Sequence, residues 1–434
     1  MSELRFDVKG WIGSTYGDEE ARVTMGSLRI DAGEGLKIPV TEVEDTLSQS
    51  VRLHINVPLV SVAEWLLMNW WRLRWEGRSN KPTTDWYRAH CLSSIGGDDA
   101  WPALELFSDG EFIQLHMKAE AAADVSAIRY LQTVSIDVPV RDFEAAVDRL
   151  VDVVEARLGS LMPHYRMLSD LRAELVEERR LASVAKICRW QALAGIDPGD
   201  ATEAWLEHAQ SLVEEVGTVA GNEVMSVLPR LDQGLTSAER VVEAMKLSTT
   251  AVDLSFVAPA SASAGRELPW QKGTRLAREI RTRLRLGTGP LTDRKLSELL
   301  STPLPLRGQP SARALRGGFR DGGAGGRTKI VWKSPRPENQ RFYLARMIGA
   351  AHVLGPDQHL IPVADTDTAL QKLERSFAQE FLAPWSAIDE FTDEHGLDDD
   401  ALTDAAQHFQ VSEHMIRTTL VNHCKLSRNS LPQG

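Results

Sequence analysis

The first 160 residues alternate between the hydrophobic period of strands and that of helices. Apolar and polar residues alternate from Val51 to Val57, which predicts a half-buried strand. Apolar runs on both sides of Asp109-Gly110 predict a hairpin, because glycine accepts the positive φ that a tight turn requires. Helical periods follow from Val62 to Trp75 and from Pro139 to Leu158. Residues 1–160 are therefore predicted to form an α+β domain.

Further along the chain the pattern changes three times. Residues 161–250 show only helical periods and predict a helical domain. Residues 251–268 are rich in Ser, Thr, Ala and Pro and keep no apolar period, which indicates a linker. Residues 269–396 combine helical and strand patterns, and residues 397–434 have the outline of a helix-turn-helix. The chain is thus predicted to be an α+β multidomain protein.

Composition places the chain among soluble globular proteins. Hydrophobic residues make up 43% and charged residues 25%. No uncharged apolar run is long enough for a membrane helix, and the N-terminus lacks the pattern of a signal peptide. The three cysteines are far apart and odd in number, which favours reduced thiols. We therefore expect a cytoplasmic protein that does not engage a membrane.

Charge is distributed unevenly. The formal net charge is −12, yet residues 266–346 contain 19 Lys/Arg against 6 Asp/Glu. Such a segment suggests either an anionic partner, nucleic acid included, or acidic groups within the protein itself. The candidate anion-binding residues lie on one predicted helix: Arg275, Arg278, Arg281 and Arg285.

Tryptophan is concentrated in the first domain. Half of the 12 tryptophans lie between residues 65 and 101. One interpretation is an aromatic core between helix and sheet. The other is a protein-binding surface, because tryptophan is a frequent interface anchor. The candidates for partner binding are Trp65, Trp70, Trp71 and Trp75.

Two segments resemble a known family. The segment RFYLARMIGAAH begins at Arg341, and ERSFAQEFLAP begins at Glu374. They resemble the active-site helix and the following helix of the ImmA/IrrE family of zinc metallopeptidases. The resemblance covers about Pro269 to Asn429 and implies a zincin-like α+β domain followed by a helix-turn-helix-like pair.

The resemblance also implies that the zinc site is degenerate. The family's H-E-x-x-H positions hold Arg346, Met347 and Ala350, and Glu374 matches the third zinc ligand. A guanidinium is a permanent cation, and neither methionine nor alanine supplies a base. We therefore expect no catalytic residue, no metal and no cofactor. We predict instead that Arg346 forms an ion pair with Glu374.

Three functional hypotheses remain. The leading one is a non-catalytic ImmA/IrrE-like regulatory or scaffold protein that binds a protein partner, in a bacterial stress, mobile-element or phage-defence circuit. The second is a nucleic-acid-binding regulator that uses the arginine-rich segment. The third is a zinc metallopeptidase with unorthodox ligands, drawn from His352, Asp357, His359 and Glu374. The terminal helix pair is expected to be a structural cap rather than a DNA reader, and the oligomeric state stays open.

Overall fold

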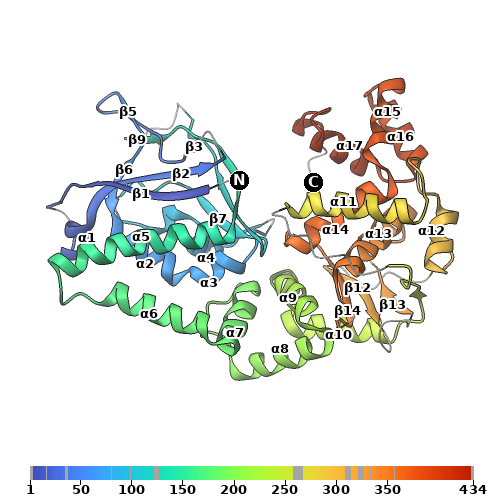
Figure 1. Ribbon diagram of the computed structural model, residues 1–434, viewed down its shortest axis with the longest axis horizontal. Helices are drawn as coiled ribbons and strands as arrows, with labels where there is room; N and C mark the ends of the chain where they lie inside the picture. Colours follow the sequence, from blue (N-terminus) through green and yellow to red (C-terminus); the bar gives the residue numbers. More distant parts are fainter. Residues whose placement is uncertain are drawn as a thin grey trace. The chain divides into compact units, whose positions relative to one another are not determined.

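The computed structural model describes residues 3–15, 17–34, 38–79, 81–97, 99–121, 127–257, 267–307, 314–320, 327–332, 334–355 and 357–431. Contacts divide the chain into two compact units, Met1–Thr202 and Glu203–Gly434. Each unit combines helices with small antiparallel sheets, so the protein is mixed α+β (Figure 1). Within these described ranges, no helix is long and apolar enough to cross a membrane.

Antiparallel sheets organise the first unit. Its strands are β1 (Glu3–Trp11), β2 (Met25–Gly33), β3 (Ile38–Pro39), β4 (Val43–Asp45), β5 (Ser50–Arg52), β6 (Ile55–Pro58), β7 (Glu105–Ser108), β8 (Phe112–Met117), β9 (Ile128–Tyr130) and β10 (Val134–Pro139). Strand β2 pairs with β1, β3 and β6, strand β8 with β7 and β10, and strand β4 with β5 and β9. The predicted hairpin is confirmed. Asp109 stabilises its turn by accepting hydrogen bonds from the backbone N–H groups of Glu111 and Phe112.

Helices complete the core of the first unit. They are α1 (Glu19–Thr24), α2 (Leu59–Met68), α3 (Trp70–Trp75), α4 (Thr84–His90), α5 (Val140–Leu161), α6 (Met167–Arg180) and α7 (Ala182–Leu193), with the 3-10 turn η1 (Leu92–Ile95). The predicted helix after Pro139 is α5. Its expected apolar stripe is buried: Phe143, Val147, Leu150, Val151, Val154 and Leu158.

Two predicted elements of the first unit are each divided in the structure. The strand expected from Val51 to Val57 is split into β5 and β6, and only its second half is buried. The single helix expected from Val62 to Trp75 begins at Leu59 and is interrupted at Asn69. The Asn69 side chain donates a hydrogen bond to the Trp65 carbonyl at 2.9 Å. The Asn69 backbone N–H donates to the same carbonyl at 3.1 Å, so Asn69 ends the first helix with two bonds to it.

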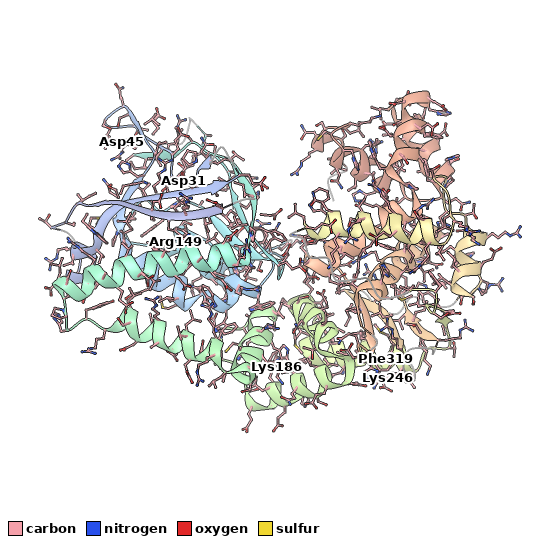
Figure 2. All side chains as sticks on the ribbon, viewed as in Figure 1. Asp31, Asp45, Arg149, Lys186, Lys246 and Phe319 are labelled. Atoms are coloured by element: carbon pink, nitrogen blue, oxygen red, sulfur yellow. The ribbon has the colours of Figure 1, made fainter. Side chains whose placement is uncertain are left out.

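The second unit is built around one four-stranded antiparallel sheet of order β11-β13-β12-β14. The strands are β11 (Ala251–Val252), β12 (Leu315–Arg320), β13 (Thr328–Val331) and β14 (Leu360–Ala364). The helices are α8 (Glu203–Val216), α9 (Thr218–Val227), α10 (Gly234–Lys246), α11 (Pro269–Arg283), α12 (Asp293–Leu300), α13 (Pro337–Val353), α14 (Ala369–Leu382), α15 (Trp385–His395), α16 (Asp399–Phe409) and α17 (Glu413–Asn422), with 3-10 turns η2 (Leu228–Arg230) and η3 (Arg428–Ser430). Helix α10 lies against the sheet, and its Lys246 lies over the ring of Phe319 on β12 (Figure 2).

Helix α13 packs against the sheet and against α14. The sheet accommodates it by carrying glycine where the helix comes close. A Cβ atom built on Gly318 would lie 3.1 Å from the Met347 sulfur and 2.3 Å from a Thr328 methyl carbon. A larger residue at Gly318 would therefore push α13 away from the sheet.

The unit boundary differs from the predicted domain boundaries. Residues 161–250 are helical, as expected, but their helices do not form one domain. Helices α6 and α7 belong to the first unit, and α8, α9 and α10 belong to the second, because each set packs on a different sheet or helix layer. The predicted linker also starts too early, since Val252 is fully buried in β11. Residues 258–266 of that linker lie outside the described residues.

The predicted helix pair at the C-terminus is present as α16 and α17. Ser412 caps the second helix by accepting a hydrogen bond from the Met415 N–H, as expected. Arg417 of that helix pairs with Asp399 and Glu413 of the same unit. These pairs use the arginine that a recognition helix would otherwise present to DNA.

Candidate functional site: a buried arginine network

The four positions that the resemblance assigns to a zinc site lie together in the interior of the second unit. Arg346, Met347 and Ala350 lie on α13, and Glu374 lies on the neighbouring α14. Their exposed fractions are 4% or less. The two helices that carry the predicted Arg346–Glu374 pair are therefore neighbours in the structure.

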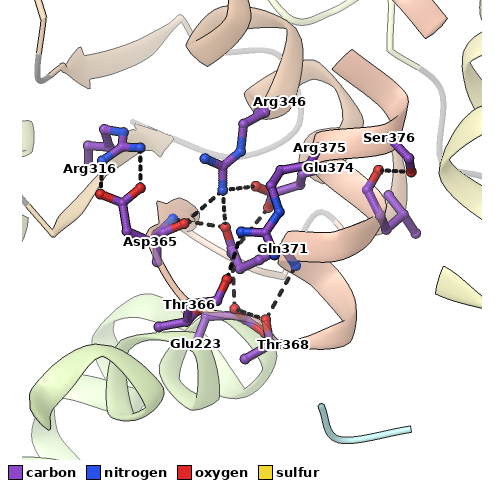
Figure 3. A network of polar contacts seen from close by, with 12 residues as sticks. Glu223, Arg316, Arg346, Asp365, Thr366, Thr368, Gln371, Glu374, Arg375 and Ser376 are labelled. Carbon is purple, nitrogen blue, oxygen red and sulfur yellow. Dashed lines mark hydrogen bonds and ion pairs between the residues drawn. The ribbon is translucent and has the colours of Figure 1, made fainter. Parts of the chain in front are cut away.

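Arg346 is held by three acceptors (Figure 3). Its Nη2 donates hydrogen bonds to the Ala364 carbonyl at 2.7 Å and to Gln371 Oε1 at 2.6 Å. The same nitrogen lies 3.5 Å from Glu374 Oε2. The predicted ion pair is thus present, but it is the longest of the three contacts. The main anchors of the guanidinium are a backbone carbonyl at the end of β14 and an amide of α14.

Gln371 is the centre of this network. Its Oε1 also accepts the backbone N–H of Ala364 at 2.9 Å. Its Nε2 donates to Glu223 Oε2 at 3.0 Å and to Glu374 Oε1 at 3.4 Å. The amide oxygen therefore faces two donors and the amide nitrogen faces two carboxyl groups, which fixes the orientation of the side chain.

Glu223 enters the network from α9, about 150 residues earlier in the chain. It is 7% exposed and accepts a second hydrogen bond from Thr368 Oγ1 at 2.7 Å. Its neighbours along the helix, Val224 and Met225, are fully buried. Nothing in the sequence indicates its role, because a single glutamate in an apolar helix carries no spacing signal. Gln371 does have a signal: Thr368 and Gln371 have the T-x-x-Q spacing typical of a helix start.

Burial sets the protonation states of the site. Burial lowers the pKa of Arg346 to about 10, so the guanidinium stays charged at neutral pH. Burial raises the pKa of the Glu374 carboxyl well above its usual range, although Arg346 opposes the change. Burial also raises the pKa of Glu223, against the hydrogen bonds from Thr368 and Gln371. Two buried carboxyl groups therefore share the positive charge of Arg346 and Arg375. Glu223 has the shorter hydrogen bonds, so Glu374 is the better candidate to hold a proton.

Positions 347 and 350 fill space rather than present ligands. The Met347 sulfur lies 3.9 Å from the Tyr343 hydroxyl, which donates to the Gly317 carbonyl at 2.9 Å. Ala350 is fully buried and has no ligand atom. A zinc ion needs about four neutral or anionic donors, whereas these positions supply one carboxyl group and a cation. The residues present do not fit zinc.

The unorthodox metal ligands are not brought together either. The ring of His359 stacks on Phe319 of β12, 6.2 Å between centroids. His352 is buried near the end of α13. Among the residues described, no group of three or more His, Cys, Asp or Glu side chains is arranged to hold a metal ion.

The arginines of α11 are largely used within the second unit. Two pair with glutamates: Arg275 with Glu267 and Glu279, and Arg278 with Glu380. Arg281 is 4% exposed and donates to backbone carbonyls, including that of Phe381 at 2.6 Å. Its inclusion as an anion-binding residue is therefore wrong, because its donors are buried and satisfied. Of the four, Arg285 is exposed and has no ion pair with any residue that the structure describes.

Other arginines of the basic segment are also bonded to groups within the second unit. They bind backbone carbonyls or single carboxylates of the same unit: Arg316 with Asp365, Arg320 with Gly355 and Gln358, Arg327 with Ala251 and Ser301, and Arg341 with Leu291 and Asp293. The positive charge of residues 266–346 is thus balanced in good part by acceptors inside the unit.

The tryptophans proposed for partner binding form part of the first unit's core. Trp65, Trp70 and Trp71 are at most 7% exposed. Trp71 Nε1 donates to Glu178 of α6 at 2.7 Å, and the guanidinium carbons of Arg74 and Arg189 lie 4.0 and 4.1 Å from the centroid of the Trp75 ring. The partner-binding prediction for the three buried rings is therefore wrong, because they are sealed by α5, α6 and α7.

The first unit also contains a buried polar cluster that the sequence did not indicate. Glu76 accepts from Arg72 at 2.6 Å and lies 2.9 Å from His90 Nε2. The other ring nitrogen of His90 faces the Leu106 carbonyl at 2.7 Å. Burial opposes ionisation of Glu76, but hydrogen bonds from His90 and Arg72 lower its pKa. The cluster joins α3, α4 and β7, which is a structural role.

Comparison of the chain with protein-family models, curated proteins and solved structures gives no match. The family resemblance therefore rests on the residues of α13, α14 and their surroundings. What the site can do has to be argued from its own geometry.

A substitution at Glu374 should change how stability depends on pH. The folded protein holds the Glu374 proton more tightly than the unfolded chain does, so wild-type stability falls as pH rises above about 4.5. Glu374→Gln removes this titration. The free energy of unfolding of the variant, relative to wild type, should rise between pH 5 and 7 by up to about 1.4 kcal/mol per pH unit. Urea unfolding at each pH measures it. Parallel curves for variant and wild type would contradict the assignment, and Glu207→Gln, at an exposed site on α8, is the control.

Proposed function

We propose that the protein is a non-catalytic, ImmA/IrrE-like regulatory or scaffold protein that acts by binding a protein partner. The observation that carries the proposal is Arg346. A buried, hydrogen-bonded guanidinium stands at the position where the family resemblance places the first zinc ligand. Its charge opposes a metal ion at the same place, and water activation then lacks both a metal and a base.

An exposed tryptophan on the second unit supports the proposal that the protein binds a protein partner. Trp270, on the first turn of α11, is 50% exposed. An exposed tryptophan beside charged residues is typical of interface anchors. Relatives in the ImmA/IrrE family cleave or control repressors, so the resemblance implies a stress, mobile-element or phage-defence circuit.

Nucleic-acid binding receives less support. The arginines that suggested it are mostly paired with carboxylates or carbonyls of the same unit. A steep loss of DNA affinity with salt would be needed to restore this hypothesis.

Introducing the H-E-x-x-H motif into α13 tests whether this helix matches the active-site helix of the family. The variant R346H/M347E/A350H places two histidines at i and i+4 on α13, facing Glu374 on α14. We expect it to bind one equivalent of zinc, and we expect addition of Glu374→Gln to weaken binding at least about tenfold, because a ligand is lost. Elemental analysis and zinc titration followed by thermal unfolding measure both.

The wild-type protein is the matched comparison. It should contain no stoichiometric zinc and should show no thermal shift with zinc. A wild-type zinc site abolished by Glu374→Gln would overturn the non-catalytic proposal. A folded triple variant that binds no zinc would instead overturn the match of α13 to the family helix.

A further inference from the structure

A pocket on the second unit is open to solvent and lined by arginines and hydroxyl groups. Its volume is about 320 Å³, near the lower end of the range of small-molecule sites, roughly 300–1,000 Å³. It is formed by residues that lead into β11 (249–251), follow α12 (301–303), lie in the next loop (306–307) and precede β13 (Arg327). Thr249, Ser301 and Arg307 are exposed, so a ligand from solution can reach this pocket.

Arg327 is fixed at the wall of the pocket through one of its nitrogens. Its Nη2 donates to the Ala251 carbonyl at 2.7 Å, and to the Ser301 carbonyl and Thr302 Oγ1, both at 3.1 Å. Its Nε and Nη1 have no hydrogen bond to any residue that the structure describes. The guanidinium is therefore held in place while some of its donors remain for a ligand.

Arg307 brings a second guanidinium to the same pocket. Its side chain is exposed and has neither an ion pair nor a hydrogen bond within the described part of the chain. One carboxylate is affected by the charge of Arg327: hydrogen bonds from Ser255 lower the pKa of Asp253, and Arg327 adds to the effect. Asp253 is not among the residues that line the pocket. Two guanidinium groups beside one carboxylate leave the pocket with positive charge.

The backbone acceptors around the pocket are already occupied. The Thr250 carbonyl accepts the Ile330 N–H at 2.9 Å, and the Thr302 carbonyl accepts Ser297 Oγ at 2.6 Å. The two carbonyls that would otherwise repel an anion beside Arg327 are covered by its Nη2. The wall therefore presents few free acceptors to a ligand.

Neutral donors complete the wall. The hydroxyl groups of Thr249, Thr250 and Ser301 line the pocket, and none is hydrogen-bonded to another described residue. A hydroxyl can turn its proton toward an acceptor on a ligand. An excess of free donors over free acceptors, together with positive charge, selects an anion that accepts several hydrogen bonds.

We propose that this pocket binds a small phosphate ester, whose phosphate is held by Arg307 and Arg327 and whose organic part lies against Pro303 and Leu306. A phosphate monoester carries nearly two negative charges at neutral pH, which matches two guanidinium groups. The planar fork of arginine suits phosphate oxygens. This ligand is additional to the proposed protein partner, and no residue of the Arg346 network takes part in its binding.

Isothermal titration calorimetry of the full-length protein tests the proposal with glycerol 3-phosphate. In low-salt buffer we expect one equivalent to bind and inorganic phosphate to compete with it. Arg307→Gln should weaken binding at least about tenfold, because a charged donor is lost. Thr249→Val should weaken it about threefold, because a neutral donor is lost. Arg307→Gln should melt like wild type, since Arg307 has no polar partner among the described residues.

A matched control separates the pocket from the general charge of the unit. Arg294→Gln removes an arginine whose side chain is 90% exposed and which lies outside the pocket, so the affinity should not change. Equal weakening by Arg294→Gln and Arg307→Gln would overturn the site. Failure of wild type to bind either phosphate compound at millimolar concentration would overturn it as well, and so would wild-type affinity in Arg307→Gln.

A nucleic acid is the other source of phosphate groups. A single-stranded oligonucleotide without terminal phosphates presents only phosphodiesters, which carry one charge each. We expect that it does not displace glycerol 3-phosphate. Displacement that Arg307→Gln abolishes would overturn the small-ligand assignment in favour of a nucleic acid. The zinc content of the protein does not enter this test, so its outcome is independent of the test of the proposed function.

Discussion

Replacing Arg346 with Met is expected to lower the free energy of unfolding of the second unit by about 3–5 kcal/mol, because a buried ionic network loses its cation. Ala364 O and Gln371 Oε1 lose a donor at 2.7 and 2.6 Å, and Glu223 loses a charge that compensates it. Urea unfolding at pH 7, followed by circular dichroism and tryptophan emission, measures the loss. Arg294→Met is the control, since the Arg294 side chain is 90% exposed.

A second substitution separates the charge from the packing. Adding Glu374→Leu to Arg346→Met replaces a buried carboxyl group that has lost its partner with an apolar side chain, so at least half of the lost stability should return. A loss below about 1 kcal/mol for Arg346→Met alone would show that the network contributes little.

Replacing Gly273 with Ala is expected to cost about 3 kcal/mol or more, although glycine to alanine ordinarily stabilises a helix interior by up to about 1 kcal/mol. A Cβ atom at Gly273 would lie 2.2 Å from the Leu373 carbonyl oxygen and 2.2 Å from Ser376 Oγ. The carbonyl belongs to the backbone of α14 and cannot rotate away. Helix α11 would have to separate from α14, which would also disturb the Arg278–Glu380 pair.

Two comparisons test this reasoning by thermal unfolding. Gly289→Ala has no atom within 4 Å of the added carbon and should change stability little. The double variant Gly273→Ala/Ser376→Ala should recover little, because the backbone clash remains. A Gly273→Ala variant as stable as wild type would mean that α11 and α14 are further apart than the structure places them.

The sequence predicts helices, turns and caps well where the hydrophobic period agrees with the local turn or capping residues. Helix α5, the hairpin at Asp109-Gly110 and the cap at Ser412 lie where expected, because each depends on residues close in the chain. The helix that ends at Trp75 is predicted as continuous, whereas the structure divides it at Asn69. A break of this kind leaves little trace in a hydrophobic pattern, because apolar residues continue on both sides of it.

The candidate site was predictable only in part. The pairing of Arg346 with Glu374 follows from matching two helices to one motif, and the ion pair is present at 3.5 Å. Gln371 and Glu223 were missed, although they make the shorter contacts of the network. Glu223 comes from a helix far away in sequence, and no local rule connects it to α14.

The basic segment illustrates the limit of charge counting. Residues 266–346 look like an anion-binding surface in one dimension. In three dimensions Arg281 and Arg341 bind backbone carbonyls of the loop between α11 and α12. The acceptors are peptide groups, which a count of Asp and Glu does not register. Arginine suits this use because its planar fork can bind several oxygens at once.

The guanidinium of Arg346 has a consequence for what the folded state of the second unit depends on. Where a metal ion joins two helices, the folded state depends on loading, on chelators and on the availability of that ion in the cell. In this chain the charge that joins α13, α14 and the end of β14 is synthesised with the polypeptide. The second unit therefore joins these elements at this place through non-covalent contacts of its own side chain. Metal starvation cannot remove them.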